Sequence, residues 1–142
     1  MKVIFLDIDG VLINSDSSGS FSSESIKELN YIVESTGAKI VITSTWRLTM
    51  SEEQLKDYFS SEGMKCDIID KTPSMMQSRG VDILVWLQET DLEIEKFVII
   101  DDINEMTNME QYLVLIDSKT GLTKDYREQI KGILKSDKGR EA

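Results

Sequence analysis

Two aspartates stand two residues apart directly after the first apolar run of the chain, in the segment Asp7-Ile8-Asp9-Gly10. In a strand, residues two apart point to the same face, so the two carboxylates are expected side by side. That spacing allows one carboxylate to attack an electrophile while the other transfers protons. Gly10 permits a sharp turn directly after the pair, which would let the carbonyl oxygen of Asp9 reach a metal ion.

Polar residues also follow two other apolar runs, Thr43-Ser44 after the second and Asp101-Asp102 after the fourth. In an open parallel sheet the loops at the carboxyl ends of the strands converge on one crevice, so these groups are expected to meet. Carboxylates brought together there would repel one another strongly at low dielectric, and a divalent cation relieves that repulsion. Because every candidate ligand atom is a hard oxygen, we expect Mg²⁺ as the cofactor.

Two residue types narrow the chemistry further. The chain contains no histidine, which excludes Ser-His-Asp and Cys-His catalysis together with most zinc and haem sites. Catalysis is therefore expected from carboxylates, hydroxyl groups or a metal ion held by oxygen atoms. The only cysteine, Cys66, precludes an internal disulfide. We expect it in the core of a protein from a reducing, cytoplasmic compartment.

The composition suits a compact soluble domain, with 40% apolar and 30% charged residues. There are 26 Asp and Glu against 16 Lys and Arg, and the resulting formal net charge of −10 disfavours general coating of nucleic acids. No apolar run approaches the roughly 20 residues of a membrane helix, so no membrane span is expected. The length of 142 residues predicts one domain, which we place at 1–135, with a polar C-terminal tail at 136–142.

Short apolar runs alternate along the chain with longer segments of helical period, which predicts strands and helices in strict alternation. The runs are continuous, as expected for a parallel sheet covered by helices on both faces. The predicted strands are Lys2–Leu6, Lys39–Thr43, Cys66–Ile69, Phe97–Ile100 and Leu113–Ile116.

Capping residues and apolar spacing predict the helices. Ser22 or Ser23 opens the first and Gly37 ends it, because serine caps a helix start and glycine adopts the left-handed cap cheaply. The second opens with the capping-box pattern of Ser51 and Gln54 and ends at Gly63. Further helices are expected near 80–90 and 124–135, with a short one over Met106–Tyr112.

These elements predict a three-layer α/β/α sandwich around a five-stranded parallel, Rossmann-like sheet. The segment between Leu12 and Ser22 is too short for a folded cap domain, and residues 44–79 hold little beyond one helix and one strand of the core. We therefore expect no substantial cap, and an open site at the carboxyl edge of the sheet.

Three segments resemble the motifs of haloacid dehalogenase-like (HAD) phosphatases. Phe5-Leu6-Asp7-Ile8-Asp9-Gly10-Val11-Leu12 resembles the first motif, Ile40-Val41-Ile42-Thr43-Ser44 the second and Val98-Ile99-Ile100-Asp101-Asp102 the fourth. The resemblance spans roughly residues 2–123. Within it, Ser44–Arg47, Arg79–Leu87 and Gly121–Thr123 are similar to a capless bacterial subgroup, some of whose members are fused to RNA-repair modules.

The resemblance implies a role for each aspartate. Asp7 would attack phosphorus and form an aspartyl-phosphate, and Asp9 would protonate the leaving oxygen and then activate water. Mg²⁺ would be held by the Asp7 side chain, the Asp9 carbonyl and Asp102, with Asp101 orienting this shell. The sequence leaves open which of Asp101 and Asp102 contacts the metal, and Asp102 is the preferred ligand.

The phosphate-binding candidates are Thr43, Ser44 and Arg79. Thr43, the first choice, and Ser44 could donate hydroxyl or backbone hydrogen bonds to a phosphoryl group, unless each hydroxyl bonds its own backbone instead. The third motif of the family is commonly Lys, whereas the corresponding helix here opens with Arg79. Arg79 could neutralise Asp7 and bind a phosphate oxygen, or form only a surface ion pair. Lys71 is the reserve candidate for this cation.

Arg47 and Trp46 follow the second strand and are candidates for substrate contact. Arg47 could bind a substrate phosphate or base, or form a structural salt bridge. Trp46 could offer a stacking platform, or pack in the core. The sequence leaves both pairs of alternatives open.

The sequence therefore predicts a Mg²⁺-dependent phosphomonoester hydrolase with an open site. The expected partner is a phosphorylated small molecule or a phosphorylated nucleic-acid or protein end, and a homo-oligomer could cover the site. A phosphotransferase with the same residues and a non-catalytic binding module with the same fold are the alternatives. A response-regulator receiver is disfavoured, because it requires an acceptor Asp after the third strand and a Lys after the fifth, where this chain has Asp70-Lys71 and Asp117-Ser118.

Overall fold

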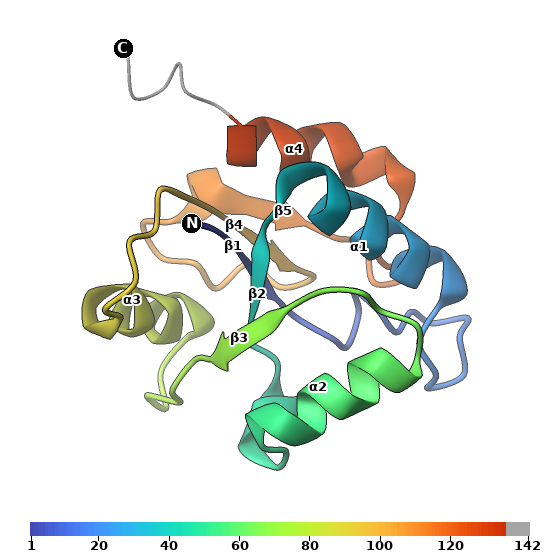
Figure 1. Ribbon diagram of the computed structural model, residues 1–142, viewed down its shortest axis with the longest axis horizontal. Coiled ribbons are helices and arrows are strands. Elements are labelled where there is room, and N and C mark those ends of the chain that lie inside the picture. The colour runs from blue at the N-terminus through green and yellow to red at the C-terminus, as the bar shows by residue number, and fades with distance from the viewer. Residues whose placement is uncertain (136–142) are drawn as a thin grey trace.

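The computed structural model describes residues 1–135, and the predicted tail at 136–142 lies outside the described residues. Five parallel strands form one sheet in the order β3-β2-β1-β4-β5 (Figure 1). The strands are β1 (Lys2–Leu6), β2 (Lys39–Ile42), β3 (Ile68–Lys71), β4 (Lys96–Asp101) and β5 (Leu113–Leu115). The prediction of a five-stranded parallel sheet is confirmed.

Four α-helices and three 3₁₀ turns connect the strands. They are α1 (Ser23–Thr36), η1 (Thr45–Leu48), α2 (Glu52–Ser61), α3 (Arg79–Glu89), η2 (Glu110–Tyr112), η3 (Lys124–Tyr126) and α4 (Arg127–Lys135). Ser22 caps α1, and Gly37 ends it in the left-handed conformation at φ +73°. Ser51 and Gln54 form the predicted capping box of α2. The capping signals therefore located these helix ends correctly.

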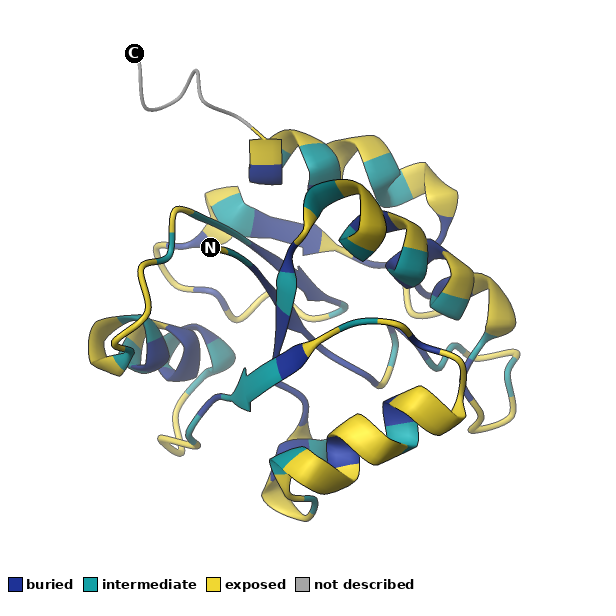
Figure 2. Ribbon diagram, viewed as in Figure 1, coloured by how far each residue is buried: buried dark blue, intermediate teal, exposed yellow. Residues whose placement is uncertain are grey.

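Helices cover both faces of the sheet, as predicted. Strand side chains alternate between the faces, so Ile4 and Leu6 pack with apolar residues of α1, α2 and α4. Val3 and Phe5 point the other way, into a second cluster with α3 and the segment 106–113. In Figure 2 the central strands are buried along most of their length, while the outward faces of the helices are exposed. The result is an α/β/α sandwich.

Three predicted strands, β2, β4 and β5, differ from the structure by a single residue at one or both ends, whereas two other predicted elements are wrong by more. The third strand runs over Ile68–Lys71 and not Cys66–Ile69, and its register against β2 shifts between Ile40 and Val41. Because β3 is an edge strand, it can hold the polar Asp70 and Lys71, which a search for apolar runs leaves out. The short helix expected over Met106–Tyr112 contracts to the turn η2, since Asn108 lies at φ +66°, which interrupts a right-handed helix.

The strand order reverses beside β1, which places the candidate residues together. β2 and β3 lie on one side of β1, and β4 and β5 on the other. The backbone N–H of Asp7 donates to Ile100 O at 3.0 Å, and that of Thr43 donates to Leu6 O at 3.0 Å. The ends of β1, β2 and β4 thus open at one edge of the sheet, where ligands bind in folds of this kind.

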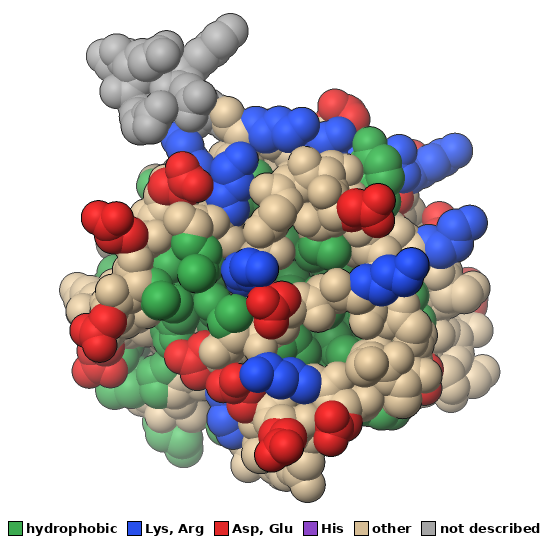
Figure 3. All heavy atoms as spheres, viewed as in Figure 1, with side chains coloured by type: hydrophobic (Ala, Val, Ile, Leu, Met, Phe, Trp, Pro, Cys, Tyr) green, Lys and Arg blue, Asp and Glu red, His purple; other side chains and the backbone are tan. Residues whose placement is uncertain are grey.

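Within the described residues, no cap domain covers this edge. Residues 7–22 between β1 and α1 form turns, and Asn14 Nδ2 donates to Thr120 O in the loop after β5 at 3.0 Å. No helix in residues 1–135 has the length and apolar character needed to cross a membrane. Charged side chains of both signs lie on the face drawn in Figure 3, with Lys and Arg gathered over α4.

Candidate active site

Three carboxylates meet at the ends of β1 and β4. Oxygen atoms of Asp7, Asp101 and Asp102 all lie within 4.8 Å of one another. Asp7 and Asp101 are buried, at 2% and 0% exposure, and Asp102 is half-buried. Four aspartates were predicted to surround a metal ion, and the structure brings the carboxylates of three of them together; the fourth is Asp9, whose carbonyl oxygen was the predicted ligand.

Arg79, the first residue of α3, supplies the cation beside these carboxylates. Its Nη1 atom lies 2.8 Å from Asp7 Oδ1 and 2.8 Å from Asp101 Oδ2. The contact with Asp101 is an aligned hydrogen bond, whereas the one with Asp7 is an ion pair outside hydrogen-bond geometry. Lys71, the reserve candidate, instead donates to the carbonyl oxygens of Arg47 and Met50 at 2.9 and 3.1 Å.

Gly80 allows the start of α3 to approach the loop after β4. A Cβ atom at this position would lie 2.8 Å from Glu105 O and 2.9 Å from Met106 Cα, closer than real Cβ atoms come to backbone. The N–H of Gly80 donates to the same Glu105 O at 3.0 Å. Because only glycine fits, this residue holds Arg79 within reach of Asp7 and Asp101.

Gly10 likewise leaves space for a neighbouring group, the carboxylate of Asp102. It adopts φ +87°, and a Cβ atom there would overlap the carboxylate of Asp102. Side chains other than glycine are therefore doubly disfavoured, by backbone conformation and by space. Glycine at the turn after Asp9 therefore allows the Asp102 carboxylate to lie close to this turn.

The carboxylates of the cluster outnumber the positive charges beside them. Burial, followed by repulsion from Asp101, raises the pKa of Asp7 to about 8, against the lowering effect of Arg79. Burial likewise raises the pKa of Asp101, although Arg79 opposes it. One guanidinium faces three carboxylates, which leaves two negative charges without a partner when all three are ionised. A divalent cation would supply that missing charge.

Three oxygen atoms of the site are buried without a hydrogen-bond partner among the described residues. They are Asp7 Oδ1, Thr43 Oγ1 and Asp102 Oδ1. A fourth such atom among the described residues, Thr72 Oγ1, lies at the Arg47 cluster after β3. Buried polar atoms are normally satisfied, so three unpartnered oxygen atoms at adjoining strand ends favour a ligand bound there. Carboxylate oxygens suit Mg²⁺, and a threonine hydroxyl suits a phosphoryl oxygen. The residues present therefore fit a magnesium ion with a bound phosphate.

The two neighbouring aspartates at the end of β4, Asp101 and Asp102, differ in which carboxylate oxygen atoms lack a hydrogen bond. Asp101 Oδ2 accepts from Arg79, and its Oδ1 accepts from the N–H of Ile103 at 3.0 Å. Asp102 keeps Oδ1 without a partner. Only Asp102 therefore has an uncommitted oxygen atom to offer to a metal ion.

Thr43 and Ser44 lie at the end of β2 with their side chains buried. Thr43 Oγ1 is free, whereas Ser44 Oγ accepts from the N–H of Trp46 at 3.3 Å and caps the turn η1. The Thr43 hydroxyl is thus the readier phosphate donor of the two. Ser44 still has a hydroxyl proton to donate.

Asp9 is exposed, and its carboxylate stands apart from the three clustered ones. Asp9 Oδ2 accepts a hydrogen bond from Trp46 Nε1 at 3.2 Å. Trp46 itself is half-buried and packs against the larger core cluster. Of the two alternatives for Trp46, packing is the one observed, together with this contact to Asp9.

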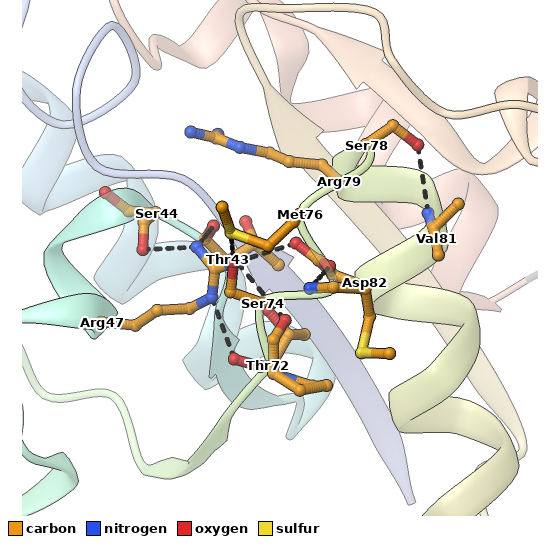
Figure 4. A network of polar contacts seen from close by, with 12 residues as sticks. Thr43, Ser44, Arg47, Thr72, Ser74, Met76, Ser78, Arg79, Val81 and Asp82 are labelled. Atoms are coloured by element: carbon orange, nitrogen blue, oxygen red, sulfur yellow. Dashed lines mark hydrogen bonds and ion pairs between the residues drawn. The ribbon is translucent and has the colours of Figure 1, made fainter.

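Arg47 forms the structural salt bridge that the sequence left open. Only 5% of the residue is exposed, and its Nη2 donates to Asp82 Oδ2 at 2.7 Å. Its Nη1 donates to the carbonyl oxygens of Thr43 and Ser44, at 2.7 and 3.0 Å, and its Nε donates to Thr72 O at 2.9 Å. In Figure 4 Arg47 reaches between Ser44 and Thr72, while Arg79 extends away from this cluster.

Asp82 is the residue of this region that the sequence analysis missed. It accepts from Arg47 through Oδ2 and from the N–H of Met75 through Oδ1, at 2.7 and 2.8 Å. It thereby connects α3 to the loops after β2 and β3. One signal was available, because Asp82 stands with Ile83 and Trp86 on the buried side of α3, where an ionised side chain needs a partner.

Comparisons with known proteins agree with this geometry. A search of curated proteins found no match. Residues 3–126 match the family described as the HAD domain in Swiss Army Knife RNA repair proteins, which covers all five strands and the clustered carboxylates. The fold, the strand-end aspartates and this match agree, and the chain belongs to that HAD family.

Proposed function

We propose that this protein is a Mg²⁺-dependent phosphomonoester hydrolase that works through an aspartyl-phosphate on Asp7. The HAD family to which it belongs suggests phosphoesterase chemistry in general. The observation that carries the narrower proposal is a set of buried oxygen atoms without a hydrogen-bond partner at the adjoining ends of β1, β2 and β4: Asp7 Oδ1, Asp102 Oδ1 and Thr43 Oγ1. A carboxylate nucleophile, a metal ligand and a phosphate donor are the parts that this reaction requires.

Asp7 is the nucleophile of the proposed reaction. A carboxylate oxygen of Asp7 forms a bond to phosphorus as the bond to the leaving oxygen breaks, and the exposed Asp9 gives that oxygen a proton. Asp9 then takes a proton from water, whose oxygen attacks the phosphorus and releases inorganic phosphate from Asp7. The buried Asp7 is held rigidly by the end of β1, which favours in-line attack.

The remaining groups stabilise charge on the phosphoryl oxygens. The Thr43 hydroxyl donates one hydrogen bond, and Arg79 offers positive charge through nitrogen atoms that do not contact Asp101. Asp7, the Asp9 carbonyl and Asp102 would hold Mg²⁺, and Asp101 keeps Arg79 in place. When bound, Mg²⁺ would neutralise negative charge on the cluster and on the phosphoryl group.

Residues 7–22 form turns and no cap domain, which favours a substrate larger than the site, such as a phosphorylated end of a nucleic acid or protein. The family description names RNA repair proteins, which favours an RNA end within this class. A phosphorylated small molecule, with a second copy covering the site, is the other expectation. A reducing, cytoplasmic location would suit the single free Cys66.

The test measures phosphate release from p-nitrophenyl phosphate with Mg²⁺ and with a chelator. Wild type is expected to turn over only with Mg²⁺, and Asp7→Asn to lose at least about 10³-fold in kcat/KM. Asp91→Asn, an exposed aspartate beyond α3, is the matched control and should behave as wild type. Equal, metal-independent rates in wild type and Asp7→Asn would overturn the assignment.

The same assay separates the alternatives. A phosphotransferase would transfer the phosphoryl group to an added alcohol, such as a nucleoside or sugar, in preference to water. A binding module would retain phosphorylated ligands without turnover in any variant. Phosphorylated oligonucleotides, sugar phosphates and phosphopeptides compared at equal concentration would then identify the substrate class.

A further inference from the structure

We propose that Trp46 is a positioning residue for Asp9, an inference that rests on the proposed function. Its indole Nε1–H donates to Asp9 Oδ2 at 3.2 Å. Asp9 is an exposed carboxylate, and an exposed side chain of this kind samples several rotamers unless a contact selects one. The hydrogen bond to Trp46 holds the carboxylate in one orientation.

The indole is itself held in place by other aromatic rings. Its ring centroid lies 5.7 Å from those of Phe21 and Tyr58, with interplanar angles of 22° and 18°. Phe21 is buried just before α1, and Tyr58 lies on α2. Rings packed in this way restrict the two side-chain torsions of Trp46. The direction of its N–H bond therefore depends on α2 and on the segment before α1.

The start of η1 fixes the backbone of Trp46 as well. Ser44 Oγ accepts from the N–H of Trp46, and the carbonyl oxygen of Trp46 accepts from Met50 N at 3.0 Å. Ser44 in turn directly follows Thr43 at the phosphate-binding end of β2. The proposed phosphate donor Thr43 and the donor to Asp9 thus lie on either side of the residue that caps η1.

The hydrogen bond leaves Asp9 able to react. It engages Oδ2 only, so Oδ1 remains available to exchange a proton with the leaving group or water. A general acid contributes most when its proton lies in line with the leaving oxygen, and small displacements reduce the rate strongly. Trp46 acts through Asp9 and does not contact the reacting atoms.

The chain contains a matched control for this contact. Trp86 Nε1 donates to Asp70 Oδ2 at 2.7 Å, between α3 and β3. This pair has the same donor and acceptor types as Trp46 and Asp9, and neither residue is in the candidate site. A substitution to phenylalanine removes the indole N–H in each case while keeping an aromatic ring.

The activity test compares Trp46→Phe and Trp86→Phe on two substrates with Mg²⁺. p-Nitrophenyl phosphate has a good leaving group that hardly needs protonation, whereas phenyl phosphate has a poorer one. We expect Trp46→Phe to lower kcat/KM, which reports formation of the aspartyl-phosphate, about tenfold on phenyl phosphate and less than about threefold on p-nitrophenyl phosphate. Trp86→Phe should leave both rates unchanged. In an Asp9→Asn background, Trp46→Phe should have no further effect on kcat/KM.

A second measurement needs no change at Trp46 and no activity. In a ¹H–¹⁵N spectrum the indole N–H signals of Trp46 and Trp86 are identified from the two phenylalanine variants. Asp9→Asn should shift the Trp46 signal alone, and Asp70→Asn the Trp86 signal alone. A Trp46 signal that Asp9→Asn does not move would overturn the contact.

The outcomes separate the two proposals. Wild type without phosphatase activity on any substrate would overturn the proposed function, and the positioning role with it. An active wild type whose Trp46→Phe variant retains the leaving-group dependence of Trp86→Phe would overturn the positioning role alone. Equal losses in kcat/KM on both substrates would show a general structural effect and would also contradict the proposal.

Discussion

Arg47 and Arg79 both lie near the carboxyl edge of the sheet, yet their surroundings differ. Every nitrogen atom of the Arg47 side chain donates to a carbonyl oxygen or to Asp82, at distances from 2.7 to 3.4 Å. Arg79 contacts its neighbours through Nη1 alone, which lies between Asp7 and Asp101. The Arg47 guanidinium uses all its nitrogen atoms, whereas the Arg79 cluster leaves charge and hydrogen-bonding capacity unused.

The difference shows how the chain divides stability from function. The Arg47 cluster fastens α3 to the loops after β2 and β3 with a buried ion pair whose polar atoms are satisfied, which favours the fold. The Arg79 cluster raises the pKa of Asp7 to about 8 by burial and by repulsion from Asp101, which disfavours the metal-free fold once Asp7 ionises. Functional sites commonly carry such local instability. The substitutions below test this division.

The largest expected effect on stability is at Asp82. Asp82→Ala leaves Arg47 buried without its counter-ion and removes the acceptor of the Met75 N–H. We expect the free energy of unfolding to fall by about 3–5 kcal/mol, measured by urea denaturation. Asp67→Ala breaks the exposed pair with Lys39 and should cost about 1 kcal/mol or less. Equal losses in both variants would contradict the structural role of the Arg47 cluster.

Arg79→Gln should have its main effect on activity. It removes the cation from beside Asp7 and a proposed phosphate contact, so kcat/KM on p-nitrophenyl phosphate should fall about 10²–10³-fold. The matched control is Arg127→Gln, since Arg127 pairs with Glu28 through two hydrogen bonds far from the site. Wild-type kcat/KM in Arg79→Gln would show that the guanidinium has no part in the reaction.

Gly80→Ala tests how the first turn of α3 positions Arg79. The added Cβ would press on the backbone of Glu105 and Met106, so we expect a loss of about 1–3 kcal/mol in unfolding free energy and a lower kcat. Gly132 in α4 has open space around an added Cβ, and Gly132→Ala should stabilise the protein by about 0.4–1 kcal/mol. A Gly80→Ala variant as stable as wild type is the result that contradicts the close approach.

The smallest expected effect is on the pH dependence of stability without metal. The unfolded chain ionises Asp7 near its ordinary pKa of 3.8, whereas the folded protein keeps it protonated up to about pH 8. Stability should therefore fall as pH rises from 5 to 8 in EDTA, by at most about 1.4 kcal/mol per pH unit. Asp7→Asn should flatten this slope, and Mg²⁺ should stabilise wild type more at pH 8 than at pH 6. A wild-type slope that Asp7→Asn leaves unchanged would refute this explanation.

Much of the fold follows from local signals in the sequence. Strand ends are set by short apolar runs, so Asp7, Thr43 and Asp101 could be placed at one edge of a parallel sheet. Helix ends are set by capping residues, as Ser51 and Gly37 show. The residues of the strand-end motifs also indicated the HAD family from the sequence alone.

Several side-chain pairs between distant segments could not be predicted. Arg47 and Asp82 are 35 residues apart, and Trp46 and Asp9 are 37 apart, with no periodicity that connects them. The sequence does not show that Asp82 lies beside Arg47, so substrate binding and a salt bridge were equal alternatives for Arg47. The end of the edge strand β3 was not predicted for a related reason, because its polar residue Asp70 accepts a hydrogen bond from the distant Trp86 indole. Such pairs depend on packing in three dimensions.

The most direct test of the central claim is a crystal structure with Mn²⁺, a hard octahedral substitute for Mg²⁺ that gives an anomalous signal. We predict one strong peak bonded to the side chains of Asp7 and Asp102, with Asp101 still bound to Arg79. Crystals at millimolar Mn²⁺ without a peak between Asp7 and Asp102, or with the ion elsewhere, would contradict the assignment of this strand edge as a metal-dependent active site.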